Sequence, residues 1–372
     1  MERAQSGSAS LHYSGPYPAN GRPDLTCNTD QKSRHCRMSR SRMTPTDYRT
    51  SVVAVPPIAL DEDLKLAHEP NVKLIRHIES GGVKSVLFGG NANLYNFDLG
   101  RFGEALALMD AAASPSTHVI TSIGPDFGKL TDQLPLVERS AIRNVMLLPM
   151  TFPMDSTGLI RGIRSAVDRL GFGIILYIKR DNYISADVLA KMVADGSVVF
   201  VKYAVERQEP AADPYLDAIL STIGRDIVAS GMGETPVADH VGKRALATFT
   251  SGAVCIAPWA SNRLLALYRA GRFEEARREV EPFLAFERFR ARLGGTQVLH
   301  DAVTAAGIAP MGPQLPMISS VPVSSLEELK AVANGLLDAD RAAAGRQAAI
   351  SAGLLSGQLV SRASQQHGSP DA

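Results

Sequence analysis

Short apolar runs alternate with amphipathic segments between about residues 51 and 257 of the chain. The runs hold consecutive apolar residues, which is typical of strands buried on both faces of a parallel sheet. The segments between them place apolar residues at three- and four-residue spacing, which predicts helices. The predicted strands span residues 51–55, 85–88, 118–123, 144–148, 173–177, 198–202, 226–229 and 253–257. The predicted helices between them span residues 72–80, 98–113, 157–170, 186–194, 213–223 and most of 237–249.

Eight strands separated by helices predict an α/β fold, a (β/α)8 TIM barrel, at residues 46–270. An open, doubly wound sheet is the alternative, because periodicity does not distinguish a closed sheet from an open one. Such a sheet usually carries a GxGxxG loop after its first strand. Here the first strand is followed by Pro56 and Pro57, so the barrel is favoured and a dinucleotide loop is excluded.

The pattern becomes purely helical after residue 258 and predicts a C-terminal helical extension of the barrel at residues 271–345. Residues 346–372 are expected to form a frayed tail, because they become polar toward the chain end. The predicted helices of this part span residues 262–270, 273–293, 296–306 and 325–338.

Residues 1–45 differ in composition from the rest of the chain. They are rich in Ser, Arg, Pro, Gly and Asn and lack apolar periodicity, so burial cannot offset the entropy of ordering them. They also lack the apolar core of a secretory signal. We expect a disordered tail here, or a translation start further along at Met38 or Met43.

The whole chain of 372 residues is 45% hydrophobic and 21% charged, which is ordinary for a globular protein. Lys and Arg number 39 against 38 Asp and Glu, and this balance argues against a nucleic-acid partner. No apolar run is long enough to cross a membrane. Three scattered cysteines favour a reducing, cytoplasmic setting over a disulfide framework or a zinc site. The histidines form no HxH or HExxH motif, so no metal site is expected.

Catalytic groups of barrel enzymes lie at the carboxyl ends of the strands, and Lys202 ends the sixth predicted strand. It follows four apolar residues, so desolvation is expected to lower the pKa of its amine. A neutral lysine amine can attack a ketone and form a Schiff base. Tyr177 ends the preceding strand and is expected beside this lysine, where its phenol would relay protons. The alternatives are a lysine that merely reaches solvent and a tyrosine at the barrel rim.

Glycines follow the second and the seventh predicted strands. Gly89 and Gly90 precede Asn91, and the missing side chains would let backbone N–H groups approach a substrate carboxylate. Gly231 and Gly233 are interpreted in the same way. A plain turn between strand and helix is the alternative in both places.

Taken together, the order and spacing of these features resemble the dihydrodipicolinate synthase / N-acetylneuraminate lyase family of class I Schiff-base lyases. The resemblance extends over about residues 48–310. It rests on the turn at 89–93, Tyr177, Lys202 25 residues later, the Ser230-Gly231 turn and the helix at 269–275.

The resemblance implies that Lys202 forms the imine and that Tyr177 relays protons. It also implies a 2-oxo acid as the substrate, no cofactor, and a homo-oligomer, either a dimer or a tetramer. The substrate-binding residues that it implies are Gly90, Asn91, Thr151, Gly231 and Val254.

This chain departs from the family pattern at four places. Gly90 and Asn91 replace a threonine pair, and Thr151 stands where the family has a tyrosine lent by a neighbouring subunit. Asn182 takes the place of an arginine, and Asn93 takes the place of a glutamate. These departures predict a sister activity, in which a 2-oxo acid such as a 2-oxo-3-deoxy sugar acid is cleaved or dehydrated.

Two further interpretations stay open. One is a barrel lyase or isomerase that uses no Schiff base, which a borohydride adduct on Lys202 would distinguish. The other is a catalytically inactive paralogue that binds a 2-oxo acid, which ligand binding without turnover would favour.

Overall fold

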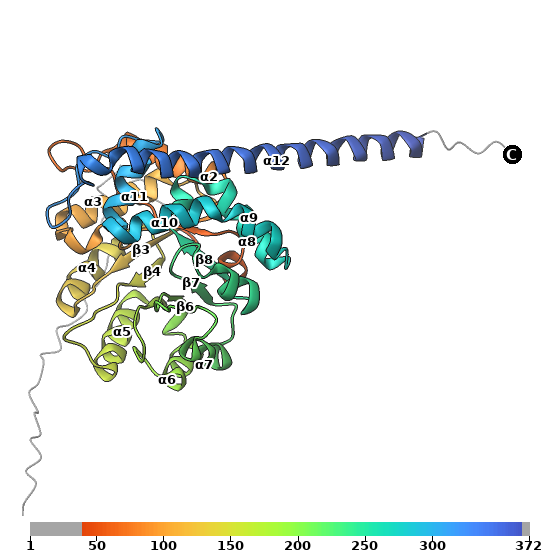
Figure 1. Cartoon of the computed structure of the whole chain (residues 1–372). Coiled ribbons are helices and arrows are strands. Elements are labelled where there is room, and N and C mark those ends of the chain that lie inside the picture. The colour runs from red at the N-terminus through yellow and green to blue at the C-terminus, as the bar shows by residue number, and fades with distance from the viewer. Residues whose placement is uncertain (1–38, 367–372) are drawn as a thin grey trace, which may run out of the picture. The chain divides into compact units, whose positions relative to one another are not determined.

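Each strand of the chain pairs in parallel with the next one along the sequence, and β8 pairs with β1, so the sheet closes into a barrel. The computed structural model describes residues 39–366 (Figure 1) and the side chains of residues 39–350. The predicted TIM barrel with a helical extension is therefore confirmed. The strands are β1 (Val53–Ala54), β2 (Ser85–Leu87), β3 (His118–Ile123), β4 (Asn144–Leu147), β5 (Ile174–Ile178), β6 (Val198–Tyr203), β7 (Val228–Ser230) and β8 (Thr248–Ser251).

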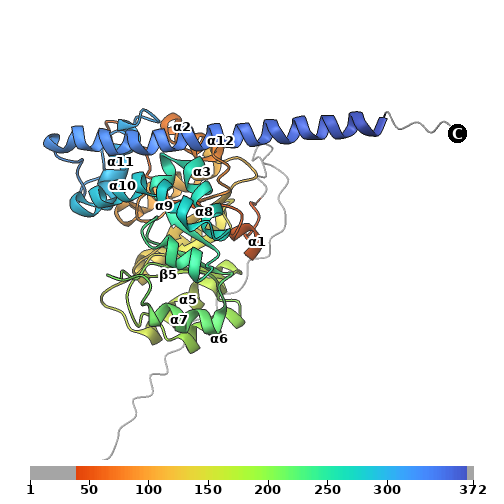
Figure 2. The ribbon, with the colours of Figure 1, turned by 45° about the vertical axis from the view of Figure 1, so that its right-hand side comes forward.

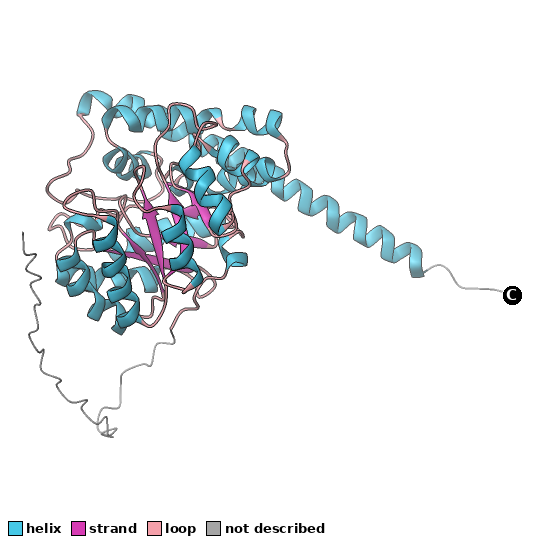
Figure 3. Ribbon diagram, turned by 90° about the horizontal axis from the view of Figure 1, so that it is seen from below, coloured by secondary structure: helices cyan, strands magenta, loops and turns pink. Residues whose placement is uncertain are grey.

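Helices follow the strands and pack outside the barrel (Figure 3). Most of them bury one apolar stripe against the sheet, as expected of barrel helices. The helices of the barrel are α1 (Pro45–Tyr48), α2 (His68–Ser80), η1 (Leu94–Asn96), α3 (Leu99–Ala112), α4 (Phe127–Arg139), α5 (Ser156–Leu170), α6 (Ala186–Ala194), α7 (Pro214–Ile223), the π-helix η2 (Ala238–Lys243), η3 (Ala253–Cys255) and α8 (Pro258–Arg269). Those that follow are α9 (Phe273–Glu279), α10 (Glu281–Leu293), α11 (Gly295–Ala305), η4 (Val323–Ser325) and α12 (Leu326–Gln366).

Side-chain caps explain where the barrel helices begin. At the start of α3, α4, α5, α6 and α7, an Asp or Ser side chain accepts a hydrogen bond from the backbone N–H three residues later. Such a cap satisfies one of the N–H groups that the first helical turn leaves unpaired. The capping residues are Asp98, Asp126, Asp155, Ser185 and Asp213.

The barrel interior is a second apolar core, separate from the core between the sheet and the helices. Large side chains from alternate strand positions fill it, including Met146 and Phe200. Tyr48 of α1 is 2% exposed and stacks on Phe200 with a ring-centroid distance of 4.3 Å. This packing fills the interior, so that only the carboxyl ends of the strands are left for a site.

The predicted boundary of the N-terminal tail at residue 45 is too late. Residues 1–38 lie outside the described part of the chain, but the segment that follows them packs on the barrel. The Arg40 guanidinium lies 2.6 Å from the Asp110 carboxylate, and Met43 is 7% exposed. The Met43 N–H donates to the Asn144 side chain at 2.8 Å. The sequence pattern misses this segment because its composition is polar. A few specific contacts, rather than a periodic apolar face, hold the segment on the barrel.

The eighth strand is the one strand that the apolar pattern misplaces. It is Thr248–Ser251, whereas the apolar run predicted at 253–257 begins with the 3-10 helix η3 and leads into α8. Threonine and serine hydroxyls interrupt β8, and Thr248 donates its hydroxyl to the backbone oxygen of Ser51 at 2.8 Å. The run at 253–257 is apolar because it is fully buried, and burial alone does not specify a strand.

Several helices also differ from the prediction. The helix predicted over most of 237–249 is only the short π-helix η2, because β8 begins at Thr248. The helix α4 was not predicted, although its apolar residues are spaced as in a helix, and it contains Pro135. The single helix predicted at 273–293 is divided into α9 and α10, and Pro282 lies in the first turn of α10. The last helix, α12, continues well beyond the predicted end at residue 338, through alanine-rich sequence with high helix propensity.

The helix α12 contacts α8, α10 and α11 (Figures 1 and 2). Asp340 of α12 accepts hydrogen bonds from the backbone N–H groups of Trp259 and Ala260 at 2.7 and 3.1 Å. It therefore caps α8 from a distant part of the sequence. No helix in the described part of the chain is long and apolar enough to span a bilayer.

Candidate functional site

A cavity of about 720 Å³ opens at the carboxyl ends of the strands. Its wall comes from the ends of β1, β2 and β5–β8 and from the extension helices α10 and α11. Of the residues predicted for the site, the structure brings five together on this wall: Lys202, Tyr177, Gly90, Asn91 and Gly231.

Lys202 lies on β6 and is 5% exposed. Its strand neighbours in register are Tyr177 on β5 and Ala229 on β7. The amine nitrogen lies 4.5 Å from the centre of the Tyr177 ring. Burial, together with the positive charges of Lys179 and Arg290, lowers the pKa of this amine from 10.5 to about 7. A large share of the amine is therefore neutral and nucleophilic near pH 7.

The Tyr177 phenol keeps its proton at neutral pH. Burial raises the pKa of this group well above its ordinary value, and Tyr95 and Glu206 raise it further. A protonated phenol beside a neutral amine can donate to a substrate oxygen that the amine attacks.

The turn after β2 presents backbone donors to the cavity. Among the hydrogen bonds found within residues 39–366, none uses the N–H groups of Gly90 and Asn91. The Asn91 side chain is fixed, because its amide donates to the Val55 carbonyl at 3.0 Å. The turn is therefore anchored to β1 and has free N–H groups suited to an anion.

Gly231 allows β6 and β7 to approach closely beside the lysine. A Cβ at this position would lie 2.7 Å from the Ala204 Cβ and 3.1 Å from the Lys202 Cγ. Its N–H donates to the Tyr203 carbonyl at 2.6 Å. Gly231 thus contributes to the site through the space that it leaves next to Lys202.

Two of the predicted site residues lie away from the cavity. Val254 belongs to η3 and is fully buried in the core, which corrects its assignment to substrate binding. The error follows from the misplaced eighth strand, whose true end brings Thr250 and Ser251 to the cavity. Thr151 is exposed after β4 and does not line the cavity either.

A carboxyl pair that the sequence pattern does not predict lies beside the cavity. Glu234, in the loop after β7, is 1% exposed and accepts a hydrogen bond from the Ser251 hydroxyl at 3.0 Å. Burial and the nearby Glu287 carboxylate raise the pKa of Glu234 to about 8. Glu287 pairs with Arg290 of α10 at 2.7 Å. The helical extension thus contributes charged groups to the site. No short sequence motif indicates this contribution, because α10 is far from the barrel strands along the chain.

Glu234→Gln is expected to change how stability depends on pH. Because the folded pKa is raised, the wild-type carboxyl stabilises the fold below about pH 4.5 and loses this contribution as pH rises through 8. Glutamine does not titrate, so the variant is expected to gain stability relative to wild type, on the order of a few kcal/mol, between these pH values. Urea unfolding at a series of pH values measures this, with exposed Glu206→Gln as the control. A difference between variant and wild type that stays constant with pH would contradict it.

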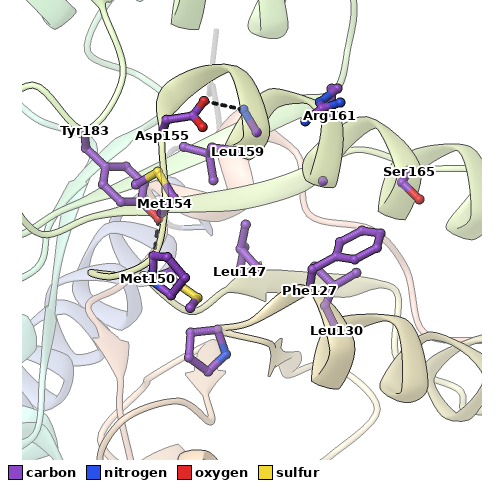
Figure 4. Close-up of a pocket in the computed structure, with 14 residues that line it drawn as sticks. Phe127, Leu130, Leu147, Met150, Met154, Asp155, Leu159, Arg161, Ser165 and Tyr183 are labelled. Atoms are coloured by element: carbon purple, nitrogen blue, oxygen red, sulfur yellow. Dashed lines mark hydrogen bonds between the residues drawn. The ribbon is translucent and has the colours of Figure 1, made fainter. Parts of the chain in front are cut away.

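A second cavity of about 700 Å³ lies between α4 and α5 on the outside of the barrel (Figure 4). Apolar side chains dominate its wall, among them Phe127 and Met154. Its carboxylate, Asp155, accepts from the Gly158 N–H at 2.8 Å and so caps α5. Tyr183 on its edge accepts from the Met150 N–H at 3.3 Å. The wall holds no lysine, so the buried amine chemistry belongs to the first cavity alone.

The described part of the chain contains no candidate metal-binding site. No group of three or more His, Cys, Asp or Glu side chains within it has the arrangement of a metal site. Cys255 is buried without a disulfide, and burial raises the pKa of its thiol.

No protein-family model matches the sequence, and no curated protein matches it at a significant level. The fold does match solved structures. Dihydrodipicolinate synthase from Bacillus clausii aligns with a TM-score of 0.67 and 19% identity over 79% of this chain and 99% of that one. N-acetylneuraminate lyase from Fusobacterium nucleatum aligns with a TM-score of 0.67 and 12% identity over 78% of this chain and 99% of that one. A catalytic lysine mutant of the Ruminococcus gnavus sialic acid aldolase aligns with a TM-score of 0.68 and 13% identity over 79% of this chain and 97% of that one.

These alignments cover 78–79% of this chain and nearly the whole of each solved structure. The chain therefore shares the fold of dihydrodipicolinate synthases and of N-acetylneuraminate lyases. At such low identity the likeness concerns the fold, and any activity has to be argued from the site.

Proposed function

We propose that the protein is a Schiff-base lyase of the dihydrodipicolinate synthase / N-acetylneuraminate lyase family, acting on a 2-oxo acid. The observation that carries the proposal is the buried Lys202 amine at the carboxyl end of β6, in register with Tyr177. The fold supports it, because the structures that share this fold include dihydrodipicolinate synthases and a sialic acid aldolase described as having a catalytic lysine.

In the proposed reaction the substrate carboxylate binds the free N–H groups of Gly90 and Asn91. The Lys202 nitrogen attacks the 2-keto carbon while Tyr177 gives its proton to the keto oxygen, and the nitrogen then gives a proton back to the Tyr177 phenolate. Tyr177 protonates the resulting hydroxyl, which leaves as water, and the nitrogen lone pair forms the C=N bond. The product is a protonated imine on Lys202.

The imine then serves as the electron sink. In aldol cleavage, the C4 hydroxyl gives its proton to the Tyr177 phenolate, the C3–C4 bond breaks, and its electron pair moves to the imine, which becomes an enamine. Tyr177 then returns the proton to C3, and this restores the imine. In dehydration, C3 loses a proton to the Tyr177 phenolate, and Tyr177 gives this proton to the C4 hydroxyl, which leaves as water. Addition of water to the imine finally releases the oxo acid and restores the amine.

The departures at Asn93 and Asn182 favour a substrate such as a 2-oxo-3-deoxy sugar acid over that of the synthase. Several amide and hydroxyl groups line the cavity beyond the lysine, including Asn96, Thr235 and Thr250, and such groups suit a hydroxylated chain. We further propose that the enzyme works in the cytoplasm as a homo-oligomer, a dimer or a tetramer, and that it needs no cofactor.

The test is reductive trapping of the imine. The full-length protein is incubated with pyruvate and sodium borohydride, and the adduct is located by intact mass and peptide mapping. We expect a stable adduct on Lys202, absent in Lys202→Ala and retained in Lys179→Ala, the matched lysine on the same cavity wall. Turnover is then sought with 2-oxo-3-deoxy sugar acids.

The outcomes separate the candidate functions. An adduct with no turnover of any such acid would favour the inactive, 2-oxo-acid-binding paralogue. No adduct with pyruvate or with longer 2-oxo acids would exclude the Schiff-base mechanism.

A further inference from the structure

Arg290 brings a positive charge from the helical extension to the wall of the lysine cavity. It lies on α10, and its side chain is 12% exposed. Its Nη1 donates to the Glu287 carboxylate at 2.7 Å, and its Nε donates to the Gly295 carbonyl at 3.1 Å. The guanidinium carbon lies 5.8 Å from the centre of the Phe286 ring. These contacts hold the guanidinium in place before any ligand binds.

The Arg290 guanidinium keeps donors for a further partner. A guanidinium has five N–H donors. The bonds from Nη1 and Nε are the hydrogen bonds that it makes within the part of the chain whose side chains are described, so the Nη2 donors are free. Arg207, elsewhere on the cavity wall, bridges the carboxylates of Asp181 and Asp213. A guanidinium of this chain can therefore bind two anions at once.

Arg290 also lies next to the turn proposed to hold the substrate carboxylate. The two come together at Gly252, just after β8. A Cβ built on Gly252 would lie 3.4 Å from the Arg290 Nη1 and 3.1 Å from the Asn91 Nδ2. Glycine leaves the space that both side chains need. All three residues line the cavity, so Arg290 and the turn lie side by side on its wall.

The turn itself carries no charge. Gly90 has no side chain, and the Asn91 amide donates to the Val55 carbonyl at 3.0 Å, so the turn offers neutral N–H groups to an anion. A hydrogen bond from a charged donor is shorter and about twice as strong as one between neutral groups. A carboxylate on this turn would therefore be bound more tightly with a fixed guanidinium beside it.

The acids around Arg290 leave its charge effective. Glu287 carries a negative charge and pairs with the guanidinium. Glu234 lies near Glu287, but burial and the Glu287 charge raise the pKa of Glu234 to about 8, so this carboxyl is mostly neutral at pH 7. A substrate carboxylate therefore meets one negative charge beside the guanidinium rather than two, and the repulsion is smaller.

We propose that Arg290 binds the carboxylate of the 2-oxo acid together with the N–H groups of Gly90 and Asn91, and that it makes the site select 2-oxo acids over neutral ketones. The proposal rests on the proposed function, because it requires a 2-oxo acid whose keto group reacts with Lys202. The helical extension thus takes part in substrate recognition, since it supplies the charged donor that the turn lacks.

The test compares pyruvate with pyruvamide, which has the same ketone but no charge. The full-length protein is titrated with each ligand, the imine is trapped with sodium cyanoborohydride, and the rate of adduct formation gives the half-saturating concentration. We expect Arg290→Gln to raise this concentration by about 10- to 100-fold for pyruvate and to leave it nearly unchanged for pyruvamide. Arg290→Lys keeps the charge but loses the fork of donors, so its value for pyruvate is expected to lie between those of wild type and Arg290→Gln.

Comparing the two ligands separates recognition of the carboxylate from other effects. Loss of the Arg290 charge also raises the pKa of Lys202, and this slows imine formation with both ligands alike. Arg292→Gln is the matched control. Arg292 lies on the same helix, 5.1 Å from the centre of the Phe289 ring, and pairs with Glu328, but its side chain is 55% exposed and does not line the cavity. Its loss is expected to leave both half-saturating concentrations unchanged.

The outcomes distinguish this inference from the proposed function. An equal loss for pyruvate and pyruvamide would show that Arg290 acts through the amine or the fold, and the inference would be wrong. It would also be wrong if the value for pyruvate did not change. If Arg290→Gln does not fold, Arg290→Lys is decided by the same comparison. In these cases the wild-type adduct still supports the Schiff base. If wild type forms no adduct with any 2-oxo acid, the proposed function itself fails, and this inference fails with it.

Discussion

Lys202→Met is expected to abolish catalysis and at the same time to make the protein more stable. The variant loses the only nucleophile that we assign to the reaction, so turnover is expected to fall by at least about 1,000-fold, with no borohydride adduct. Methionine fills a similar volume without a charge, so the 5% exposed site no longer has to bury an amine.

The gain in stability has a defined pH dependence. The folded pKa of Lys202 is about 7 against 10.5 for an exposed lysine, so the unfolded chain holds this proton more tightly. The wild-type penalty is therefore complete at and below about pH 7, shrinks as pH rises, and vanishes near pH 10.5. We expect Lys202→Met to exceed wild type by a few kcal/mol at pH 6 and by much less at pH 9.5.

Lys179→Met is the matched control for this prediction. Lys179 also lines the cavity, but its side chain is exposed and its charge lowers the pKa of Lys202. Its loss is expected to leave stability nearly unchanged and to shift the pH at which the adduct forms toward alkaline values. Equal stabilisation by Lys202→Met and Lys179→Met would contradict this prediction. So would a gain in stability of Lys202→Met that does not depend on pH.

The pairing of Lys202 with Tyr177 was predictable because it depends only on strand order and period. Lys202 and Tyr177 each end a continuous apolar run, and successive strands of a barrel are neighbours. The register then places them directly opposite each other. The turn with Gly90 and Asn91 was predictable for the same reason, since it follows a strand on the same face of the barrel.

The rest of the site depends on information that local patterns do not contain. Thr250 and Ser251 come from a strand whose hydroxyl groups break the apolar run, so periodicity assigns the strand to the wrong residues. Arg290 reaches the cavity from α10, nearly ninety positions along the chain from Lys202. Glu234 gains its raised pKa through burial and through Glu287, which lies on α10. Contacts between distant segments determine these features, and a single sequence does not show them.

Asp213→Ala is expected to cause the largest loss of stability among the polar substitutions considered for this barrel. The Asp213 residue is 1% exposed and accepts hydrogen bonds from three donor groups. Its oxygens lie 2.8 and 2.9 Å from the Tyr203 hydroxyl, and one of them lies 2.9 Å from the Arg207 guanidinium. It also caps α7 through the N–H of Leu216 at 3.1 Å.

Alanine would leave the buried Tyr203 hydroxyl without its acceptor and would remove one of the two carboxylates that pair with Arg207. Breaking such a buried pair costs about 3–5 kcal/mol in the free energy of unfolding. Tyr203 directly follows Lys202 on β6 and faces away from the cavity, toward Asp213 and α7. Asp213 therefore supports the strand that positions the amine, and we expect slower adduct formation even where the variant remains folded.

Urea unfolding of Asp213→Ala and Asp217→Ala, measured side by side, checks this expectation. Asp217 is the matched control, because it lies in the same helix and pairs with Arg244, but its side chain is 56% exposed. Its loss is expected to change stability by no more than about 1 kcal/mol. Asp213→Asn keeps an acceptor for Tyr203 and for the helix cap, so its loss of stability is expected to lie between those of Asp213→Ala and Asp217→Ala. Similar losses for Asp213→Ala and Asp217→Ala would show that the network around Tyr203 adds no more to stability than a surface ion pair.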